Sequence, residues 1–208
     1  MNETQAIMTH SLPSARHRRK LLLLMAVFLA PPVAAWITFH FFAHDLAVGT
    51  VNIGQLVTPA RPLERFHAVD IDQGRPVDAR LFHGRWTYLV FADDCGEECR
   101  RQLFLTRQVR ASVNKDMPRV QRVLLLGESA TAPAGQRVEH PDLRRLRMDA
   151  AERVRLAPLL ELDGHGLDGH SLYLFDPLGN YMMRYDLSMP PAGMLKDLRK
   201  LLKLSRIG

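Results

Sequence analysis

The sequence predicts an α/β fold, a central mixed sheet flanked by helices, behind one N-terminal transmembrane helix. Two observations predict the domain. Strand-like and helix-like patterns follow each other along residues 64–208, and an apolar strand leads directly into a helix at the only two cysteines. A third observation, the apolar run from Leu21 to Ala43, predicts the membrane helix, because 23 residues without a formally charged side chain are long enough to cross a bilayer.

Charges at the two ends of the apolar run predict its orientation. The basic cluster Arg16 to Lys20 precedes the run and Asp45 follows it, which places the N-terminus in the cytoplasm and the rest of the chain outside. A cleaved signal peptide with Leu21 to Ala30 as its apolar core is the competing interpretation. The run continues through Phe42, which favours a retained anchor. We therefore expect a single-pass protein of the bacterial inner membrane with its domain in the periplasm.

The expected organisation has four parts. Residues 1–20 form a basic cytoplasmic arm, 21–43 the anchor, 44–63 a linker rich in Gly, Thr, Val and Pro, and 64–208 the α/β domain. The net charge of +6 is divided equally between residues 1–20 and the remainder, so the domain is only mildly basic. Its arginine-rich run at 144–147 has no interleaved aromatic residues, which disfavours a nucleic-acid partner.

Periodicity and turn residues predict the elements in chain order. Strands are expected at Arg65 to Asp72, Trp86 to Phe91, Arg119 to Gly127, Leu146 to Met148, His170 to Phe175 and Tyr181 to Tyr185. Helices are expected from Glu97, with Leu105, Val109 and Val113 on the apolar face, at Asp149 to Leu160 with Asp149 as the cap, and from Pro190 onward. In the last helix the predicted core stripe is Met194, Leu198, Leu201, Leu202 and Leu204.

Cys95 and Cys99 form the main candidate site. A spacing of four places both sulfurs on one face of a helix's first turn, close enough to form a disulfide or to share a soft metal. The helix N-terminus and two following arginines favour the thiolate, whereas the neighbouring acids oppose it, so the sign of the pKa shift stays open. The alternative without a function is that the two cysteines are unrelated buried residues.

Three features of the chain resemble the Sco/SenC family of membrane-anchored thioredoxin-fold proteins. The layout of basic arm, span and exported domain is similar. Cys95-Gly96-Glu97-Glu98-Cys99 after an apolar strand resembles the family's Cys-x-x-x-Cys, although Gly96 and Arg100 stand where the family usually has Pro. The segment from Asp168 to Gly179, with His170 before a strand and Pro177-Leu178-Gly179 after it, is similar to the family's histidine segment.

The resemblance implies a thioredoxin-like fold and a role in assembling the copper centre of cytochrome c oxidase. The expected partner is an oxidase subunit or another copper protein. Copper(I) prefers thiolates, and an imidazole completes a three-coordinate site, so Cys95, Cys99 and His170 form a suitable set. His165 and Asp163 are nearby candidates that fit a solvated loop as well, and Asp168 is the candidate partner for the second ring nitrogen of His170. His67, His83 and His140 are expected at the surface.

Alternative functions use the same residues differently. In a thiol-disulfide oxidoreductase that reduces the copper-ligand cysteines of a partner, Cys95 attacks and Cys99 resolves the mixed disulfide. A scaffold that has kept the fold without its chemistry is the third hypothesis, motivated by the missing prolines. Whether the protein is an enzyme is therefore left open. The histidine separates the first two hypotheses, because metal binding needs it and dithiol exchange does not.

The orientation prediction has a direct test. Because basic residues precede the span, a reporter fused after residue 60 should be active only if it works outside the cytoplasmic membrane. Paired fusions of a periplasm-specific and a cytoplasm-specific reporter measure this. Activity of the cytoplasmic reporter would overturn both the export and the oxidising environment expected for the cysteines.

Overall fold

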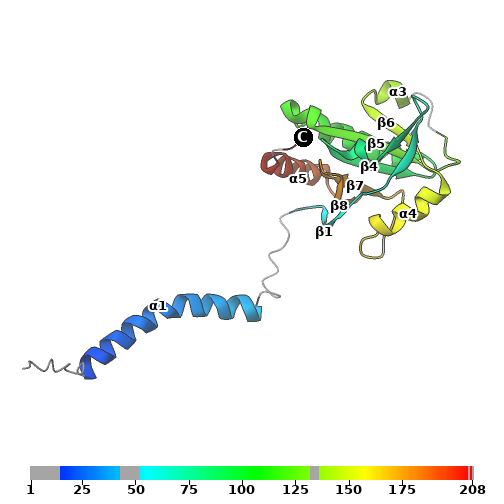
Figure 1. The fold of residues 1–208 in the computed structure, drawn as a ribbon. Helices are drawn as coiled ribbons and strands as arrows, with labels where there is room; N and C mark the ends of the chain where they lie inside the picture. The colour runs from blue at the N-terminus through cyan, green and yellow to red at the C-terminus, as the bar shows by residue number, and fades with distance from the viewer. Residues whose placement is uncertain (1–14, 43–51, 132–135, 206, 208) are drawn as a thin grey trace, which may run out of the picture. The chain divides into compact units, whose positions relative to one another are not determined.

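The computed structural model describes residues 15–42, 52–131, 136–205 and 207. The chain divides into two compact units, residues 1–49 and 50–208, which are described separately. The first unit contains one helix, α1 (Ala15–Phe42), shown in blue in Figure 1. Its segment Arg18–Thr38 has the length and the mean hydropathy, 2.2, of a membrane span, and its window has no buried residue. One N-terminal apolar helix is therefore confirmed, whereas its predicted end at Ala43 lies outside the described residues.

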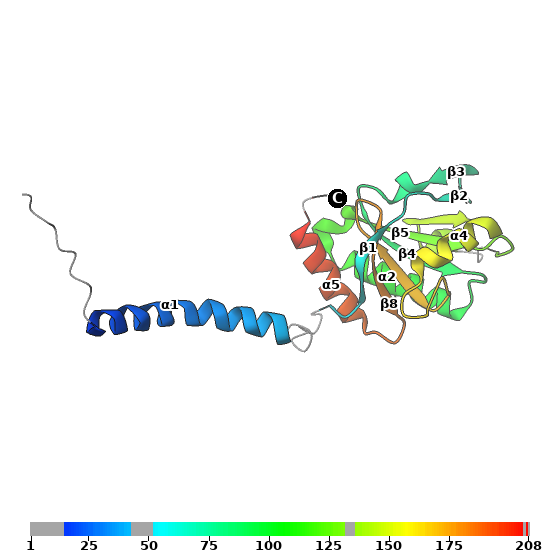
Figure 2. The same ribbon diagram turned by 60° about the horizontal axis from the view of Figure 1, so that its bottom comes forward.

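The second unit is built on one eight-stranded mixed sheet (Figures 1 and 2). The strand order is β1-β8-β7-β4-β5-β6-β2-β3; β4 pairs in parallel with β5 and β5 with β6, and the other pairs are antiparallel. The bounds are β1 (Gln55–Pro62), β2 (His67–Asp70), β3 (Arg75–Asp78), β4 (Trp86–Ala92), β5 (Val120–Leu126), β6 (Leu143–Arg147), β7 (Ser171–Phe175) and β8 (Asn180–Asp186). The central strands β4 and β5 are buried along their whole length, as their continuous apolar runs predict.

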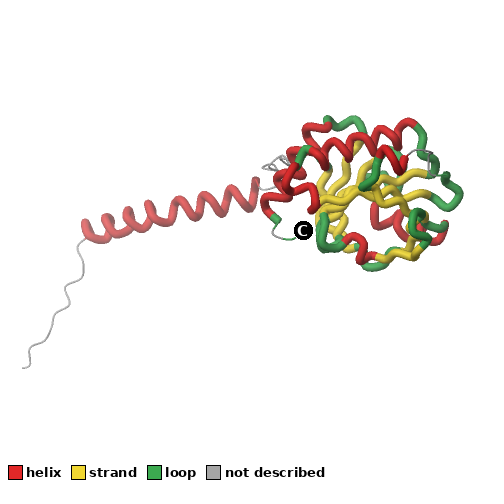
Figure 3. The backbone as a smooth tube through the Cα atoms, turned by 90° about the horizontal axis from the view of Figure 1, so that it is seen from above, coloured by secondary structure: helices red, strands yellow, loops and turns green. Residues whose placement is uncertain are grey.

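Helices cover both faces of this sheet (Figure 3). They are α2 (Glu97–Ala111), α3 (Gln136–Glu139), α4 (Ala150–Leu160) and α5 (Pro191–Leu204), with 3-10 turns η1 (Ala79–Phe82) and η2 (Asn114–Arg119). Buried side chains of α2 and α5 share one apolar core with alternate residues of β4 and β5. Buried side chains of α4 belong to a second core on the remaining residues of the same strands. The predicted mixed sheet flanked by helices is thus confirmed.

Local signals place several elements correctly. Asp149 caps α4 by accepting a hydrogen bond from the Glu152 amide at 2.7 Å. The carboxylate of Asp176 accepts bonds from the amides of Leu178 and Asn180, and Gly179 adopts φ 85° between them, which closes the predicted turn between β7 and β8. Side chains in β2 alternate between exposed and buried, as its pattern predicts.

Apolar periodicity misplaces two leucines. In α2 the buried positions include Leu103, whereas Leu105 is only half-buried, because buried Gln102 and Thr106 also belong to the inward face and rotate the stripe. In α5, Leu204 is 71% exposed at the last turn, where the helix has passed the edge of the core. The rest of the predicted α5 stripe is buried or half-buried.

The stretch expected to be a linker contains a sheet strand. β1 pairs antiparallel with β8; Pro62 is one of the paired residues, and Pro59 lies in the register shift between Leu56 and Arg61. β1 is the edge strand of the sheet, and an edge tolerates proline because one side of the strand needs no hydrogen-bond donors. The Gly- and Pro-rich composition of this stretch is the reason that the sequence did not predict the strand.

Buried Asp197 of α5 fastens the chain just before β1. Its carboxylate accepts hydrogen bonds from the Ile53 amide at 2.9 and 3.2 Å and from the Gly54 amide at 2.9 Å. Gly54 itself packs so closely that a Cβ atom would lie 2.6 Å from the Met183 sulfur. This contact fixes where the chain from the N-terminal helix enters the domain.

We expect Asp197→Ala to lower the free energy of unfolding by about 1–3 kcal/mol, because the two backbone amides lose their acceptor in a buried place. Chemical denaturation of the full chain in detergent measures the change. The matched control on the same helix is Lys196→Ala, which removes an exposed side chain and should stay within about 0.5 kcal/mol. Equal effects of the two substitutions would contradict this role of Asp197.

Candidate functional site

The cysteine pair lies where β4 ends and α2 begins. Cys95 follows the short acidic loop after β4, and Cys99 lies in the first turn of α2. The two form a disulfide with their Cα atoms 5.0 Å apart, as the spacing predicts. Both residues are buried, 4% and 3% exposed, so exposure does not single out Cys95 as the attacking thiol. That role stays a prediction.

Two acids near the pair, Asp93 and Glu98, form ion pairs with side chains of other elements. Asp93 forms an ion pair with Arg153 of α4, whose guanidinium lies 5.1 Å from the centre of the Phe91 ring. Glu97 and Glu98 occupy the first turn of α2, where carboxylates interact favourably with the helix dipole. The N-cap, Gly96, has no side-chain hydrogen bond to offer. Amides at this helix start therefore remain available to stabilise a thiolate once the disulfide is reduced.

Sheet pairing brings the histidine segment to the cysteine helix. β7 runs antiparallel beside β4, with Leu172 opposite Val90, so the start of β7 lies at the end of β4. This confirms the expected neighbourhood of the two strands. Gln102, fully buried in α2, donates a 2.6 Å hydrogen bond from Nε2 to the carbonyl of Gly169. The segment before β7 is thereby joined to α2 one turn after Cys99.

His170 lies at the surface beside this first turn. Its Nδ1 is 2.7 Å from Oε2 of Glu98, the residue before Cys99, and its side chain is 71% exposed. The hydrogen bond and charge of Glu98 raise the pKa of His170 above its usual value. The expected partner, Asp168, instead accepts a bond from the backbone amide of His170 at 3.1 Å. That expectation is corrected: the turn between Asp168 and His170 directs the carboxylate to the backbone, and α2 supplies the ring's partner.

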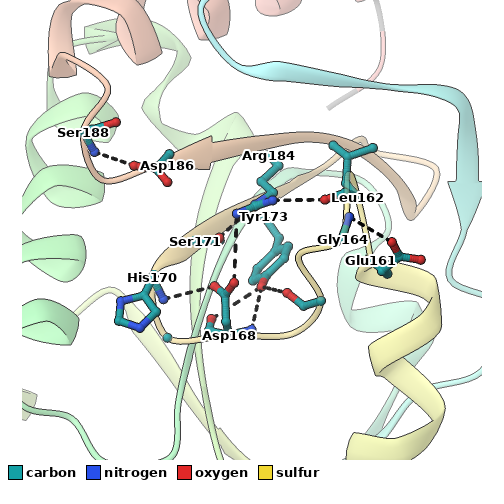
Figure 4. Close-up of polar contacts among 12 residues, drawn as sticks. Glu161, Leu162, Gly164, Asp168, His170, Ser171, Tyr173, Arg184, Asp186 and Ser188 are labelled. Atoms are coloured by element: carbon teal, nitrogen blue, oxygen red, sulfur yellow. Dashed lines mark hydrogen bonds and ion pairs between the residues drawn. The ribbon is translucent and has the colours of Figure 1, made fainter.

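Two buried side chains hold the loop that precedes His170 (Figure 4). Arg184 of β8 donates from Nε to the Ser171 hydroxyl at 2.8 Å and from Nη1 to the Leu162 carbonyl at 3.2 Å. The Tyr173 hydroxyl donates to the Gly166 carbonyl at 2.7 Å and accepts from the Asp168 amide at 2.9 Å. Burial raises the pKa of Tyr173 to about 12, so the hydroxyl keeps its proton for this bond. Hydrogen bonds from buried side chains of β7 and β8 therefore hold the backbone that leads to His170.

The other histidines lie elsewhere. His165 is exposed in a separate turn, where its backbone pairs with that of Leu162, and neighbouring Asp163 is exposed too. His67 and His83 are exposed, as expected. His140 is buried instead, with Nδ1 3.5 Å from the guanidinium of buried Arg122; the expectation that it lies at the surface is wrong because that arginine and its partners form an internal polar cluster.

No three His, Cys, Asp or Glu side chains among the described residues are gathered as a formed metal site. The sulfurs are bonded to each other and the His170 ring is bonded to Glu98. The donor types nevertheless fit a soft metal, since the two sulfurs belong to one turn and the imidazole is bonded to Glu98 of that turn. Reduction of the disulfide would release the two sulfur donors.

Sequence reasoning missed the residues that position the site. The role of Gln102 could have been inferred from the sequence, because a polar residue three positions after Cys99 falls on the inward face of the helix. No comparable sequence pattern reveals the roles of Arg184 and Glu98. Their roles depend on β8 and β7 lying beside the right neighbours, which the local pattern does not specify.

A comparison of the sequence with protein-family models identifies the family of this chain. The model of the transmembrane-like, thioredoxin-like C-terminal domain family matches residues 86–205, more than half of the chain. The chain belongs to this family. The match begins at β4 and extends to the end of α5, so this thioredoxin-like domain includes the cysteine pair and His170. Among curated proteins, none matches the sequence.

Solved Sco structures share the fold. Copper-bound ScoI of Arabidopsis thaliana is 20% identical at a TM-score of 0.54, over 68% of this chain and 98% of that one. Copper-bound yeast Sco1 is 14% identical at 0.55, over 69% and 94%. BsSco, described with a disulfide switch as a member of the Sco family of cytochrome c oxidase assembly proteins, is 15% identical at 0.50, over 73% and 99%. At these identities the likeness confirms the thioredoxin-like fold that the resemblance implies.

The pairing of Glu98 with His170 predicts a measurable titration. The carboxylate stabilises the imidazolium, so His170 should titrate above its usual pKa, and Glu98→Gln should lower that pKa toward 6.5. The contribution of the pair to stability should be complete below the usual pKa and lost as the pH rises through the raised one. NMR of the imidazole protons measures the His170 pKa in the oxidised unchanged protein and in the oxidised Glu98→Gln variant.

The control is Glu97→Gln, which removes the adjacent carboxylate without touching the pair. It should leave the His170 pKa close to its value in the unchanged protein. A His170 pKa at or below 6.5 in the unchanged protein would contradict the observed contact.

Proposed function

We propose that this protein is a membrane-anchored, Sco-like copper chaperone of the bacterial periplasm, which passes copper to a cytochrome c oxidase subunit or another copper protein. The observation that carries the proposal is the 2.7 Å contact between His170 and Glu98, because Glu98 is the residue next to Cys99. An imidazole is thus available at the turn that carries the two sulfurs. The N-terminal apolar helix supports the anchoring, and its basic flank supports an external domain.

Copper is the cargo in this proposal, and Cys95, Cys99 and His170 are its ligands. Thiolates and imidazole suit copper(I), which accepts low coordination numbers and soft donors. Loading requires reduction of the disulfide by an external dithiol. In that exchange the reductant's two thiols become a disulfide, and Cys95 and Cys99 each receive a hydrogen. His170 must also exchange its contact with Glu98 for one with the metal, and its exposed position leaves the ring room to turn.

The structural relatives agree with this cargo. The Arabidopsis and yeast proteins were solved with copper bound, and BsSco is described as belonging to a family of oxidase assembly proteins. Their identities to this chain are 20% or less, so they support copper handling here through the shared fold only. The residues of this chain itself are the main argument.

A second function is favoured by the closed disulfide. As a thiol-disulfide oxidoreductase, the reduced protein would attack a partner's disulfide through the Cys95 thiolate, releasing one partner sulfur as a thiol. Cys99 would then attack the sulfur of Cys95, close the internal disulfide and release the second partner thiol. The Cα separation of 5.0 Å allows this closure without rearrangement of the helix start. The two functions differ in whether His170 is needed.

Copper content of the full chain distinguishes them. After reduction in detergent, the unchanged protein should hold one copper(I) per chain, and Cys99→Ser should hold almost none. His170→Ala should weaken copper(I) affinity by about tenfold or more, since one of three donors is lost, while thiol labelling of Cys95 and Cys99 stays unchanged. His83→Ala, an exposed histidine outside the site, is the control and should bind normally.

Other results lead to other functions. Undiminished affinity in His170→Ala would remove this histidine from the site. Absence of copper from the reduced unchanged protein would overturn the chaperone proposal, and turnover of a partner disulfide would then support the oxidoreductase. Loss of copper in His165→Ala with retention in His170→Ala would transfer the ligand role to His165.

A further inference from the structure

The solvent face of α5 is unusually basic. Lys196, Arg199, Lys200 and Lys203 are all exposed, whereas the single acid of the helix, Asp197, is buried and bonded to the amides of residues 53 and 54. The helix therefore presents four positive charges to solvent without a compensating negative one. Three of the four lysines that follow the membrane helix are among them.

A hollow beside the C-terminal half of α5 extends this charge. It has a volume of about 630 Å³ and lies between α5 and η2. Its cationic lining is Lys115, Arg119, Arg199 and Lys203, and its one acid, Asp116, pairs with Arg119 at 3.2 Å. The fourth lysine of the domain thus lies at the same surface, which we call the basic face: Lys115, Lys196, Arg199, Lys200 and Lys203.

Exposed apolar side chains adjoin the basic face where α5 ends. Leu204 is 71% exposed and Ile207 is 51% exposed, and both line a second, apolar hollow of about 270 Å³ together with Leu178, which is 61% exposed. An apolar tip next to a basic helix face is an arrangement typical of surfaces that lie in the headgroup region of a membrane. A core role for Leu204, which its spacing predicts, is ruled out by this exposure.

Covalent connection limits how far the basic face can lie from the membrane. Asn52 accepts a 3.4 Å hydrogen bond from Lys200, so the domain's first described residue sits on α5 itself. Only residues 43–51 separate it from the last residue of α1, Phe42, and ten extended steps reach at most ~35 Å. The 14 residues of α5 are about 21 Å long. If α1 spans the bilayer, a tether of this length permits the basic face to reach the headgroups.

We propose that the basic face and the apolar tip of Leu204 and Ile207 dock the domain on the surface of its own membrane by binding anionic phospholipid headgroups. Lysine and arginine gain electrostatic attraction at such a surface, and the tether supplies a high local concentration of lipid. The inference rests on the proposed anchoring through α1. It does not depend on copper or on the cysteine chemistry.

Docking in this way would orient the cysteine pair. Trp86, at the first residue of β4, lines the apolar hollow, and Cys95 follows the opposite end of the same strand. Seven strand residues extend about 20 Å. A domain that rests on Leu204 and Ile207 therefore holds its disulfide away from the bilayer, where a membrane-bound partner's external domain can reach it.

The test uses the full chain in lipid nanodiscs with a fluorophore on Leu204→Cys. Both native cysteines are in the disulfide, so the new thiol is labelled selectively without reductant. The control label is Val154→Cys on α4, which is 73% exposed against 71% for Leu204. In discs containing phosphatidylglycerol, brominated lipid should quench the label at 204 about threefold more than that at 154. In discs of phosphatidylcholine alone, and in high salt, this difference should disappear.

Charge variants identify the contact. Lys196→Gln/Lys200→Gln/Lys203→Gln should abolish the extra quenching at 204 in the anionic discs. The matched control, Arg65→Gln/Arg75→Gln/Arg137→Gln, removes three exposed arginines from β2, β3, α3 and their flanks and should keep it. Equal quenching at 204 and 154, equal quenching in both lipids, or equal losses in the two triple variants would each overturn the proposal. A protein partner in place of lipid would give equal quenching in both lipids in this purified system.

Failure of anchoring and failure of docking have different signatures. If the chain stays in the discs after alkaline washing but position 204 is not quenched, docking is wrong and the proposed function is unaffected. If the chain washes out of the discs, α1 is not an anchor, and docking falls with it. Copper binding of the lysine variant should equal that of the unchanged protein in either case.

Discussion

Antiparallel pairing of β4 with β7 is the constraint on which the site depends. β4 ends immediately before the cysteine loop, and an antiparallel neighbour must begin where β4 ends. The residues before β7 are therefore brought to the first turn of α2, although about 70 positions separate them in the chain. Gln102 of α2 then holds the two segments together by donating a hydrogen bond to the carbonyl of Gly169. Any shift in this pairing would separate His170 from Glu98.

The state of the two sulfurs decides which chemistry the site can perform. A closed disulfide occupies both sulfurs and leaves His170 with its carboxylate partner. A reduced pair provides two thiols on the same turn, at a helix start, where backbone amides favour the thiolate. Metal capture and dithiol exchange therefore compete for the same two atoms. A copper role and a redox role are alternatives for one reduced state, and the surrounding fold is suited to both.

Asp197 and the segment at residues 52–54 link the domain's stability to its attachment. The buried carboxylate holds the entering chain against α5, and β1 then joins the sheet as its edge. The charge on Asp197 is used internally, so all charged side chains on the solvent side of α5 are basic. One helix thus fixes where the tether enters and presents the cations that face outward.

By itself the sequence determined the features that local physics sets. Apolar runs placed β4 and β5, and a capping aspartate placed the start of α4. The spacing of Cys95 and Cys99 predicted that the two lie within disulfide distance across one turn. These depend on residues a few positions apart, so a pattern in the chain is enough to read them. The apolar N-terminal helix follows from length and composition in the same way.

Tertiary structure alone decided the rest. The partner of the His170 ring is Glu98 and not the nearby Asp168, because α2 lies beside the start of β7. A proline-rich linker contains β1, because the edge of the sheet needs only one hydrogen-bonded side. His140 is buried and Leu204 is exposed, each against its local expectation. In every case the outcome depends on which distant element packs alongside, and the energy of that contact is absent from the local sequence pattern.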